Sequence, residues 1–430
     1  MHALKLRKSS FFSTLVLYLL VSGVLLFTYI GQIEEANAYI GMKPWSMSII
    51  GYMWVFIGLP ILAWIISHTK GYPSDFFKIF YGTITVNSFL VLHSVFGPLS
   101  AIELFSGVVI LFSPLLMIEV MGALLPVIRM KGGIKSAWIE WLLVIVLLLV
   151  LMSAAVQPPA SAGFGIDHSY DRRLEGRDIY SAGSWMAYGL SMGMNGFAPY
   201  LAFRAGLRLN FIFLGLTLAA AVFFYWLLGV KAPILYVLAA LVMGILVKRG
   251  NNNFGKYFLT AIVALGLVVL FEWMFLDTYS FTADYFFRRL FADQAQVLGC
   301  YLKFVLEDKA VFWSSLYGFV DPTFEVTYYI GDRYFDNAQA NVNVNAFFYQ
   351  LASKGIFGYC YSVVLVPFFL VMLDRIYKSS CNPSYIFLGF LYGLLVVEQA
   401  FTVAMVSSGV GVLFFITLFE QGSDSSLVKI

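Results

Sequence analysis

Two arginine clusters have the residue types needed to bind an anion. Arg172, Arg173 and Arg177 fall within one polar segment, and Arg288 and Arg289 are adjacent in another. The guanidinium group is planar and can donate two hydrogen bonds at once to phosphate oxygens. These residue types at this spacing therefore predict binding of a diphosphate.

The elements that position these arginines belong to a membrane protein. Of the 430 residues, 60% are hydrophobic and only 12% are charged, and the mean hydropathy is +0.83. Soluble domains have about 25% charged residues. The net charge of +3 gives no reason to expect a nucleic-acid partner. The three cysteines, Cys300, Cys360 and Cys381, have neither metal-binding nor redox spacing. The composition predicts an integral membrane protein.

Long apolar stretches recur along the whole chain. A helix needs about 20 apolar residues to cross the hydrocarbon core, and about twelve stretches approach that length. We therefore predict an all-α, polytopic protein in which residues 1–430 form a single transmembrane domain. The expected spans are Phe11–Ile30, Met47–Ile66, Ile79–Phe96, Ala101–Ile128, Trp138–Val156, Trp185–Phe203, Phe211–Leu228, Pro233–Val247, Phe258–Leu276, Phe357–Leu373, Ile386–Val403 and Val410–Phe419.

The distribution of basic residues predicts the orientation. Lys and Arg favour the cytoplasmic side of a membrane protein. With a cytoplasmic N-terminus, most of the 27 Lys and Arg residues fall in the expected inner segments, and an even number of spans returns the C-terminus to the cytoplasm. The basic start, MHALKLRKSS, precedes a long apolar run without a small-residue cleavage site. We expect this run to be retained as the first span.

Two expected outer loops break this charge rule. Loop 157–182 contains the first arginine cluster, and loop 277–354 contains the second. One interpretation is that nearby acidic side chains neutralise the arginines. These acids are Asp167, Asp171, Glu175, Asp178, Asp284, Asp293, Glu307 and Asp308. Because both clusters lie on the same expected face, we favour the interpretation that they bind a ligand there.

The first half of the long outer loop has a helical pattern. Arg289, Gln296 and Lys303 recur every seven residues, so they would share one helical face. Such a helix would lie at the membrane interface, where its basic stripe could bind a lipid headgroup. The alternative is an interfacial helix whose basic side chains only extend toward water.

The second half of this loop is rich in amides and tyrosines. Asn341, Asn343 and Asn345 alternate along the chain, with Tyr334 and Tyr349 nearby. Sugar hydroxyls need paired donors and acceptors, and pyranose faces pack on flat rings. The pattern is typical of a sugar-binding surface. The alternative is a polar, turn-rich loop that ends in a helix cap.

The order of motifs in this loop resembles that of a known family. FFRRLF is followed by QVLGCYLKFVLEDKAVFWS, YYIGDRYF and NAQANVNVNAFFYQLASKGIFGY. This series resembles the Arg-aromatic motif, the Tyr/Phe-rich helix, the Gly-acidic-aromatic stretch and the Asn-rich helix start of bacterial O-antigen or oligosaccharide repeat-unit polymerases of the Wzy type. The resemblance covers residues 285–359 and is only hydropathic elsewhere.

The resemblance implies a GT-C-like glycosyltransferase of the bacterial inner membrane with its active site on the periplasmic side. The donor would be a glycan on undecaprenyl diphosphate, and the acceptor would be one repeat unit on the same membrane lipid. A hydroxyl of the acceptor would attack the donor's anomeric carbon, and undecaprenyl diphosphate would leave. The resemblance also implies no metal, no cofactor and a separate chain-length regulator as partner.

Roles for individual residues follow from this resemblance and from the chemistry. Arg288, Arg289 and Asp336 are the expected catalytic residues: the arginines would stabilise the charge that develops on the diphosphate, and Asp336 is a candidate general base. Other candidate bases are Asp332, Glu325 and His168. The expected substrate-binding residues are Arg172, Arg173, Arg177, Lys303, Arg333, Tyr334, Asn341, Asn343, Asn345 and Tyr349.

Two other functions fit the same architecture. An O-antigen ligase uses the same donor with a lipopolysaccharide-core acceptor, and the Asn-rich motif is our reason for preferring the polymerase. A flippase or transporter would have its binding site near the membrane midplane. Ionisable residues in or near the apolar stretches are Glu103, Glu119, Glu140, Glu272, Glu398 and His93. We expect interfacial or packing roles for them, because several lie near the ends of expected spans.

Overall fold

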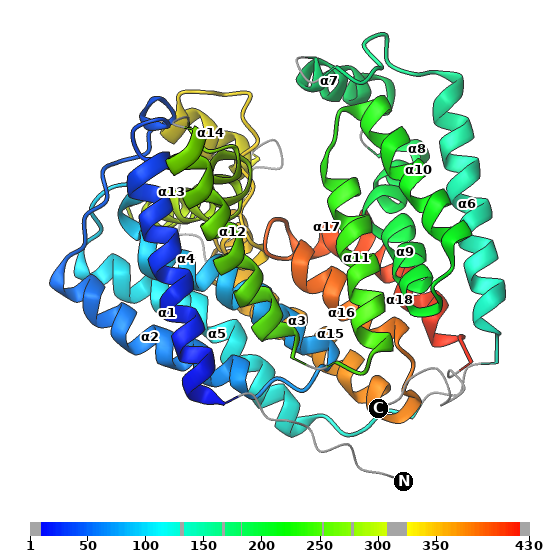
Figure 1. The fold of residues 1–430 in the computed structure, drawn as a ribbon, viewed down its shortest axis with the longest axis horizontal. Helices are drawn as coiled ribbons and strands as arrows, with labels where there is room; N and C mark the ends of the chain where they lie inside the picture. The colour runs from blue at the N-terminus through cyan, green and yellow to red at the C-terminus, as the bar shows by residue number, and fades with distance from the viewer. Residues whose placement is uncertain are drawn as a thin grey trace. The chain divides into compact units, whose positions relative to one another are not determined.

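The computed structural model describes residues 10–129, 133–165, 168–181, 183–251, 253–276, 279–307 and 325–421. The described chain is helical and contains no β-strand, so the expected all-α class is confirmed (Figure 1). The one extended contact described is an isolated bridge between Ile134 and Glu420.

Eight described helical stretches are long and apolar enough to cross a membrane. They are Phe11–Ile33, Ile49–Ser67, Pro73–Val95, Ala101–Leu124, Ser136–Val156, Phe211–Leu228, Phe254–Phe275 and Ala346–Ser380. Each overlaps one of the stretches expected from hydropathy. The chain therefore has the character of a polytopic membrane protein.

The other four expected spans do not reach this length and hydropathy. The helices Ala232–Lys248 and Ser384–Leu395 are apolar but shorter, and Val410–Leu418 has nine residues. The segment 185–208 is continuously helical, but its glycines, Asn195 and two arginines make it less apolar. A total of twelve spans thus stays a prediction.

The chain divides into two compact units. Unit 1 comprises Met1–Leu125, Asn253–Met372 and Gly393–Phe401, and unit 2 comprises Pro126–Asn252, Leu373–Tyr392 and Thr402–Ile430. The helices of unit 1 are α1 (Phe11–Thr28), η1 (Tyr29–Ile33), η2 (Ala38–Ile40), α2 (Ile49–Ser67), α3 (Pro73–Phe80), η3 (Tyr81–Val86), α4 (Asn87–Leu92), η4 (His93–Val95), α5 (Ala101–Leu124), α12 (Phe254–Leu276), η6 (Ala283–Ala292), α13 (Asp293–Glu307), α14 (Val326–Phe335) and most of α15 (Ala346–Ser380).

The segment from α3 to η4 forms the centre of unit 1. In its most apolar window, 94% of the residues are buried, a much larger share than in any other candidate span. Two of its buried polar residues, Thr83 and Asn87, have hydrogen-bonding partners on α1. Thr83 Oγ1 lies 3.1 Å from the hydroxyl of Tyr18, and Ser22 donates a 3.0 Å hydrogen bond to Asn87.

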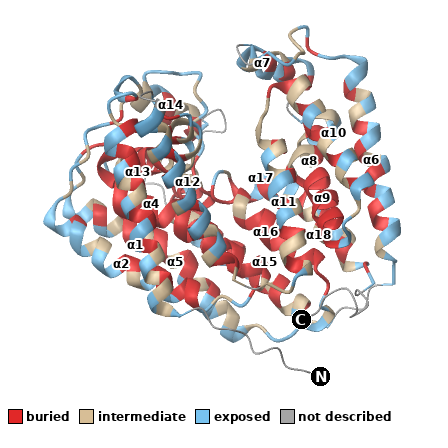
Figure 2. Cartoon of the chain, viewed as in Figure 1, coloured by how far each residue is buried: buried red, intermediate tan, exposed pale blue. Residues whose placement is uncertain are grey.

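The helix α13 also packs inside unit 1, against α4, η4, α5 and α14. Gly299 permits the close approach of this helix to Phe96, since a Cβ at Gly299 would lie 2.7 Å from the Cβ of Phe96. Most of its residues are buried, and α13 is largely red in Figure 2. The expected helix exists, and it is part of the packed unit. Its position at the membrane interface stays a prediction.

A kink divides α15 near its start. Lys354 and Gly355 leave the helical conformation, and Gly355 takes the left-handed φ of +63° that glycine adopts without strain. At Gly358 a Cβ would lie 2.6 Å from the carbonyl oxygen of Gln350. Both glycines therefore permit a sharp change of direction where the loop leads into the long apolar helix.

Unit 2 is a bundle built around closely packed α9 and α11. A Cβ at Gly206 would lie 2.4 Å from the carbonyl oxygen of Leu241, and one at Gly244 would lie 2.2 Å from that of Phe203. Small residues thus let the two backbones touch, as in many membrane helix pairs. The helices of this unit are α6 (Ser136–Val156), α7 (Ser169–Ile179), α8 (Trp185–Met192), η5 (Gly193–Phe197), α9 (Ala198–Arg208), α10 (Phe211–Leu228), α11 (Ala232–Lys248), the end of α15, most of α16 (Ser384–Leu395), most of α17 (Phe401–Val406) and α18 (Val410–Leu418).

Candidate functional site

Arg288 is fixed by two carboxylates in unit 1. It lies in the π-helix η6, where its Nε is 2.5 Å from Oδ1 of Asp284 and its Nη1 is 3.6 Å from Oδ2 of Asp293. The side chain of Arg288 is largely buried. Tyr279 extends this group, because its hydroxyl donates a 3.2 Å hydrogen bond to Asp284. The interpretation that neighbouring acids neutralise the arginines therefore applies to Arg288.

Asp293 lies in an unusual environment for a carboxylate. Burial raises the pKa of Asp293 to about 6, and the positive charges of Arg288 and Arg289 limit that rise. Its Oδ1 is buried without a hydrogen-bond partner. The group of Arg288, Arg289, Asp284 and Asp293 therefore gains positive charge when the pH falls below about 6.

Arg289 differs from its neighbour. Its side chain is exposed, and it makes no hydrogen bond or ion pair with any residue that the structure describes. Arg288 pairs with the acids around it, and the guanidinium group of Arg289 is exposed. The adjacent pair thus combines a fixed cation with an available one.

A second basic group in unit 1 joins α13 and α14. Lys303 Nζ is 3.3 Å from Oε1 of Glu307, and Arg333 Nη2 is 3.9 Å from Oε2 of the same glutamate. Two cations share one carboxylate, so these three residues have a net positive charge. Lys303 also lies over the ring of Phe96, 5.6 Å from its centroid. Arg333 lies 5.5 Å from the ring centroid of Tyr334. The structure thus brings together Lys303, Arg333 and Tyr334 from the expected site.

The two basic groups are too far apart to bind one phosphate group together. Arg289 and Lys303 are separated by fourteen residues of continuous helix, which corresponds to about 20 Å at the α-helical rise. The regular seven-residue stripe is also interrupted. Gln296 is buried and donates a 3.0 Å hydrogen bond to the carbonyl oxygen of Ile40. The wider turns of η6 change the helical phase on which the stripe prediction depended.

The Asn-rich segment contains residues of two kinds. Asn341 and Asn343 are exposed in the loop before α15, where they are accessible to a ligand. Asn345 is fully buried, and its Oδ1 accepts hydrogen bonds from the backbone N–H groups of Phe347 and Phe348. Asn345 therefore caps α15, as the alternative interpretation of this motif predicted.

The remaining residues expected in this region lie at the ends of α14 and α15. Asp336 is exposed and takes a left-handed φ of 50° directly after α14. Tyr349 is half-buried in the first turns of α15. Burial raises the pKa of Tyr334 to about 12, so this phenol stays protonated at neutral pH and can donate a hydrogen bond.

In unit 2, the first arginine cluster lies on α7. Arg172 is almost completely buried, with Nη2 2.8 Å from the carbonyl oxygen of Gly165 and the guanidinium 5.6 Å from the ring centroid of Tyr225. Its Nε has no hydrogen-bond partner. Arg173 and Arg177 are exposed. Arg172 therefore fixes α7, and the two exposed arginines are the ones accessible to a ligand.

The acids near Arg172 have other partners. Asp171 lies 3.3 Å from the ring of His168, and Glu175 accepts hydrogen bonds from Ser161. His168 is exposed. Among the expected neutralising acids, Asp167 and Asp308 lie outside the described residues. Because α7 and η6 belong to different units, the meeting of the two arginine clusters stays a prediction.

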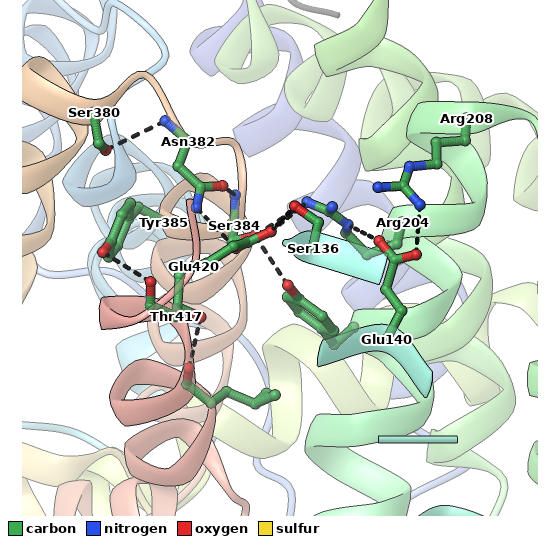
Figure 3. Close-up of polar contacts among 12 residues, drawn as sticks. Ser136, Glu140, Arg204, Arg208, Ser380, Asn382, Ser384, Tyr385, Thr417 and Glu420 are labelled. Atoms are coloured by element: carbon green, nitrogen blue, oxygen red, sulfur yellow. Dashed lines mark hydrogen bonds and ion pairs between the residues drawn. The ribbon is translucent and has the colours of Figure 1, made fainter. Parts of the chain in front are cut away.

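A buried polar network in unit 2 gives Glu140 the packing role expected for it, and the partners of Glu140 were not expected from the sequence (Figure 3). Arg204 Nε lies 2.7 Å from Glu140, Arg208 lies 2.5 Å from the same carboxylate, and Arg204 Nη1 lies 3.3 Å from Glu420. Asn382 and Ser384 donate hydrogen bonds of 2.8 and 2.7 Å to Glu420.

This network has the properties of a structural element. Two arginines balance two glutamates, and Ser136 donates to the second oxygen of Glu420. Every carboxylate oxygen of Glu140 and Glu420 therefore has a partner. No signal in the sequence predicts it, because its residues are separated by up to 284 positions.

The described residues contain no group of three His, Cys, Asp or Glu side chains arranged to hold a metal ion. Comparison with protein-family models, with curated proteins and with solved structures finds no match to this chain.

Proposed function

We propose that this chain is a membrane-embedded glycosyltransferase that joins undecaprenyl-diphosphate-linked repeat units into a surface polysaccharide at the periplasmic face of the bacterial inner membrane. The single observation that supports this most is the arginine pair in η6. Arg288 is held by Asp284 and Asp293, and exposed Arg289 makes no ion pair with a described residue. The ordered motifs of residues 285–359 supply the substrate class.

The proposed reaction needs charge stabilisation at the leaving group. A hydroxyl oxygen of the acceptor forms a bond to the donor's anomeric carbon as the bond from that carbon to the diphosphate oxygen breaks. Undecaprenyl diphosphate leaves with the electron pair, and the hydroxyl proton passes to a base or to the released diphosphate. A guanidinium group at Arg289 would stabilise the developing negative charge more than the ground state.

The second basic group, Lys303 and Arg333, could bind the lipid carrier of the acceptor. The acceptor also ends in a diphosphate, and Lys303 and Arg333 share one carboxylate about 20 Å of helix away from Arg289. We assign the Arg288–Arg289 pair to the donor and the Lys303–Arg333 pair to the acceptor. Exposed Asn341 and Asn343 are then available for sugar hydroxyls.

Deletion of the gene tests this proposal against its alternatives. Surface polysaccharide from the deletion strain should retain a single repeat unit and lose all longer chains on a gel. Loss of every repeat unit would indicate a flippase or a ligase instead. Restoration of the full ladder by the plasmid-encoded chain is the matched control.

A further inference from the structure

Unit 1 contains an open groove of about 340 Å³ between η1 and the end of α12. This volume falls in the range of roughly 300–1,000 Å³ that is usual for small-molecule sites. The groove is lined by Ile30, Gly31, Gln32, Glu35, Ala36, Trp273 and Tyr279. Trp273 and Tyr279 are each about two-fifths exposed, at 41% and 42%. The groove therefore presents two accessible aromatic side chains beside polar groups.

Hydrogen bonds hold the walls of this groove in place. Gln32 Oε1 accepts a 2.9 Å hydrogen bond from the backbone N–H of Ser280. Asn37 donates a 2.9 Å hydrogen bond to the hydroxyl of Tyr279. The ring of Trp273 packs against Phe27 with 5.4 Å between centroids. A ligand would thus meet side chains that are already ordered, which reduces the entropy cost of binding.

Two groups of the groove remain available for a ligand. The carboxylate of Glu35 is exposed and makes no hydrogen bond or ion pair with a described residue. The indole N–H of Trp273 likewise has no hydrogen-bond acceptor among the described residues. An accepting carboxylate and a donating indole, beside a flat ring, match the hydroxyls and the C–H face of a pyranose. An anionic ligand would be repelled by Glu35, and an acyl chain would leave that carboxylate desolvated.

The groove is linked to the arginine pair through one side chain. Tyr279 lines the groove, and its hydroxyl donates a hydrogen bond to Asp284, which in turn accepts from Arg288. In a glycosyl diphosphate the first sugar is bonded directly to the diphosphate. We infer that this groove binds a saccharide, namely the sugar next to the diphosphate of the lipid-linked donor. This inference rests on the proposed function for the identity of the donor.

The test measures binding of a lipid-free sugar to the purified full-length protein. The probe is the repeat-unit oligosaccharide released by mild acid from cells that lack the gene, and saturation-transfer NMR reports its contact with the protein. Trp273→Ala should weaken binding at least tenfold. Gly31→Leu should do the same by filling the groove, because a Cβ at Gly31 would meet only Trp273, at 4.0 Å.

Trp64→Ala is the matched control, because Trp64 is a similarly exposed tryptophan of unit 1, at 51%, that does not line the groove. It should bind the oligosaccharide as the unaltered protein does. Absence of saturable binding to the unaltered protein, or binding by the Trp273→Ala and Gly31→Leu variants as tight as that by the unaltered protein, would overturn the inference. If the deletion strain nevertheless keeps a single repeat unit and loses all longer chains, the inference about the groove is wrong and the proposed function stands. If the two groove variants weaken binding but the deletion strain does not show this change in chain length, only the proposed function is wrong.

Discussion

At the scale of single residues, the proposed function gives the adjacent Arg288 and Arg289 different roles. Arg289→Ala should abolish chain extension while the amount of protein in the membrane stays normal, because its side chain is exposed and makes no hydrogen bond or ion pair with a described residue. Loss of one transition-state donor costs about 2.7–4 kcal/mol, or a factor of about 100–1,000 in rate. Gel ladders and membrane immunoblots measure both effects.

Arg288→Ala should also stop chain extension, but with less protein in the membrane. The substitution removes the cation paired with the partly buried carboxylates of Asp284 and Asp293, and loss of such a partner is destabilising. Arg249→Ala is the control for both variants, since Arg249 is an exposed arginine at the end of α11. A normal ladder from Arg289→Ala would refute the role assigned to this residue.

The pKa of Asp293 predicts a pH dependence of anion binding. Burial raises this pKa to about 6, so the carboxylate is ionised at pH 7.5 and largely protonated at about pH 5. Protonation adds one positive charge to the group around Arg289. One unit charge at about 6 Å in water-like surroundings contributes about 0.7 kcal/mol, so binding of undecaprenyl diphosphate should tighten about threefold.

The comparison variant for this pH effect is Asp293→Asn, which mimics the protonated state. Its affinity for undecaprenyl diphosphate should be high at both pH values, so the change across pH 6 should disappear. A variant that keeps the full pH dependence of the unaltered protein would show that another group titrates.

At the scale of helices, hydropathy predicts the long apolar spans. It does not predict which polar side chains form hydrogen bonds with neighbouring helices. Hydropathy predicts the segment from α3 to η4 because its apolar residues outnumber polar residues such as Thr83 and Asn87. The heptad of Arg289, Gln296 and Lys303 failed as a surface stripe, since a π-helix changes the phase and Gln296 bonds to Ile40. Such details depend on contacts between residues distant in sequence, which periodicity does not contain.

The start of α15 gives a prediction about stability. Asn345→Ala should lower the free energy of unfolding by about 1 kcal/mol, because it removes the cap of this helix. Asn345→Ser should restore stability, since a serine hydroxyl also accepts from the first turn. Thermal unfolding of the protein in detergent measures both.

Asn343→Ala is the paired variant, because Asn343 is exposed two residues earlier. It should unfold like the unaltered protein and yet shorten the polysaccharide chains, as expected for a residue that contacts sugar. Loss of stability in Asn343→Ala would contradict a role in sugar binding alone. Unchanged stability in Asn345→Ala would contradict its role as the cap of α15.

At the scale of the whole molecule, the buried network of unit 2 joins helices that are distant in sequence. Arg204→Met should destabilise the protein by about 3–5 kcal/mol, because it leaves Glu140 and Glu420 buried with fewer cationic partners. Asp171→Asn removes an exposed pair with His168 in the same unit and should change stability by less than about 1 kcal/mol. Melting temperatures that fall equally in both variants would contradict a structural role for the network.

The central claim is that Arg289 binds the diphosphate of a polyprenol carrier. The most direct measurement is the affinity of purified full-length protein in nanodiscs for undecaprenyl diphosphate. A hydrogen bond to a charged group contributes about 1.5–3 kcal/mol, so Arg289→Ala should bind about 10–100-fold more weakly, while Arg249→Ala should bind normally. Equal affinities of Arg289→Ala and the unaltered protein would contradict the claim.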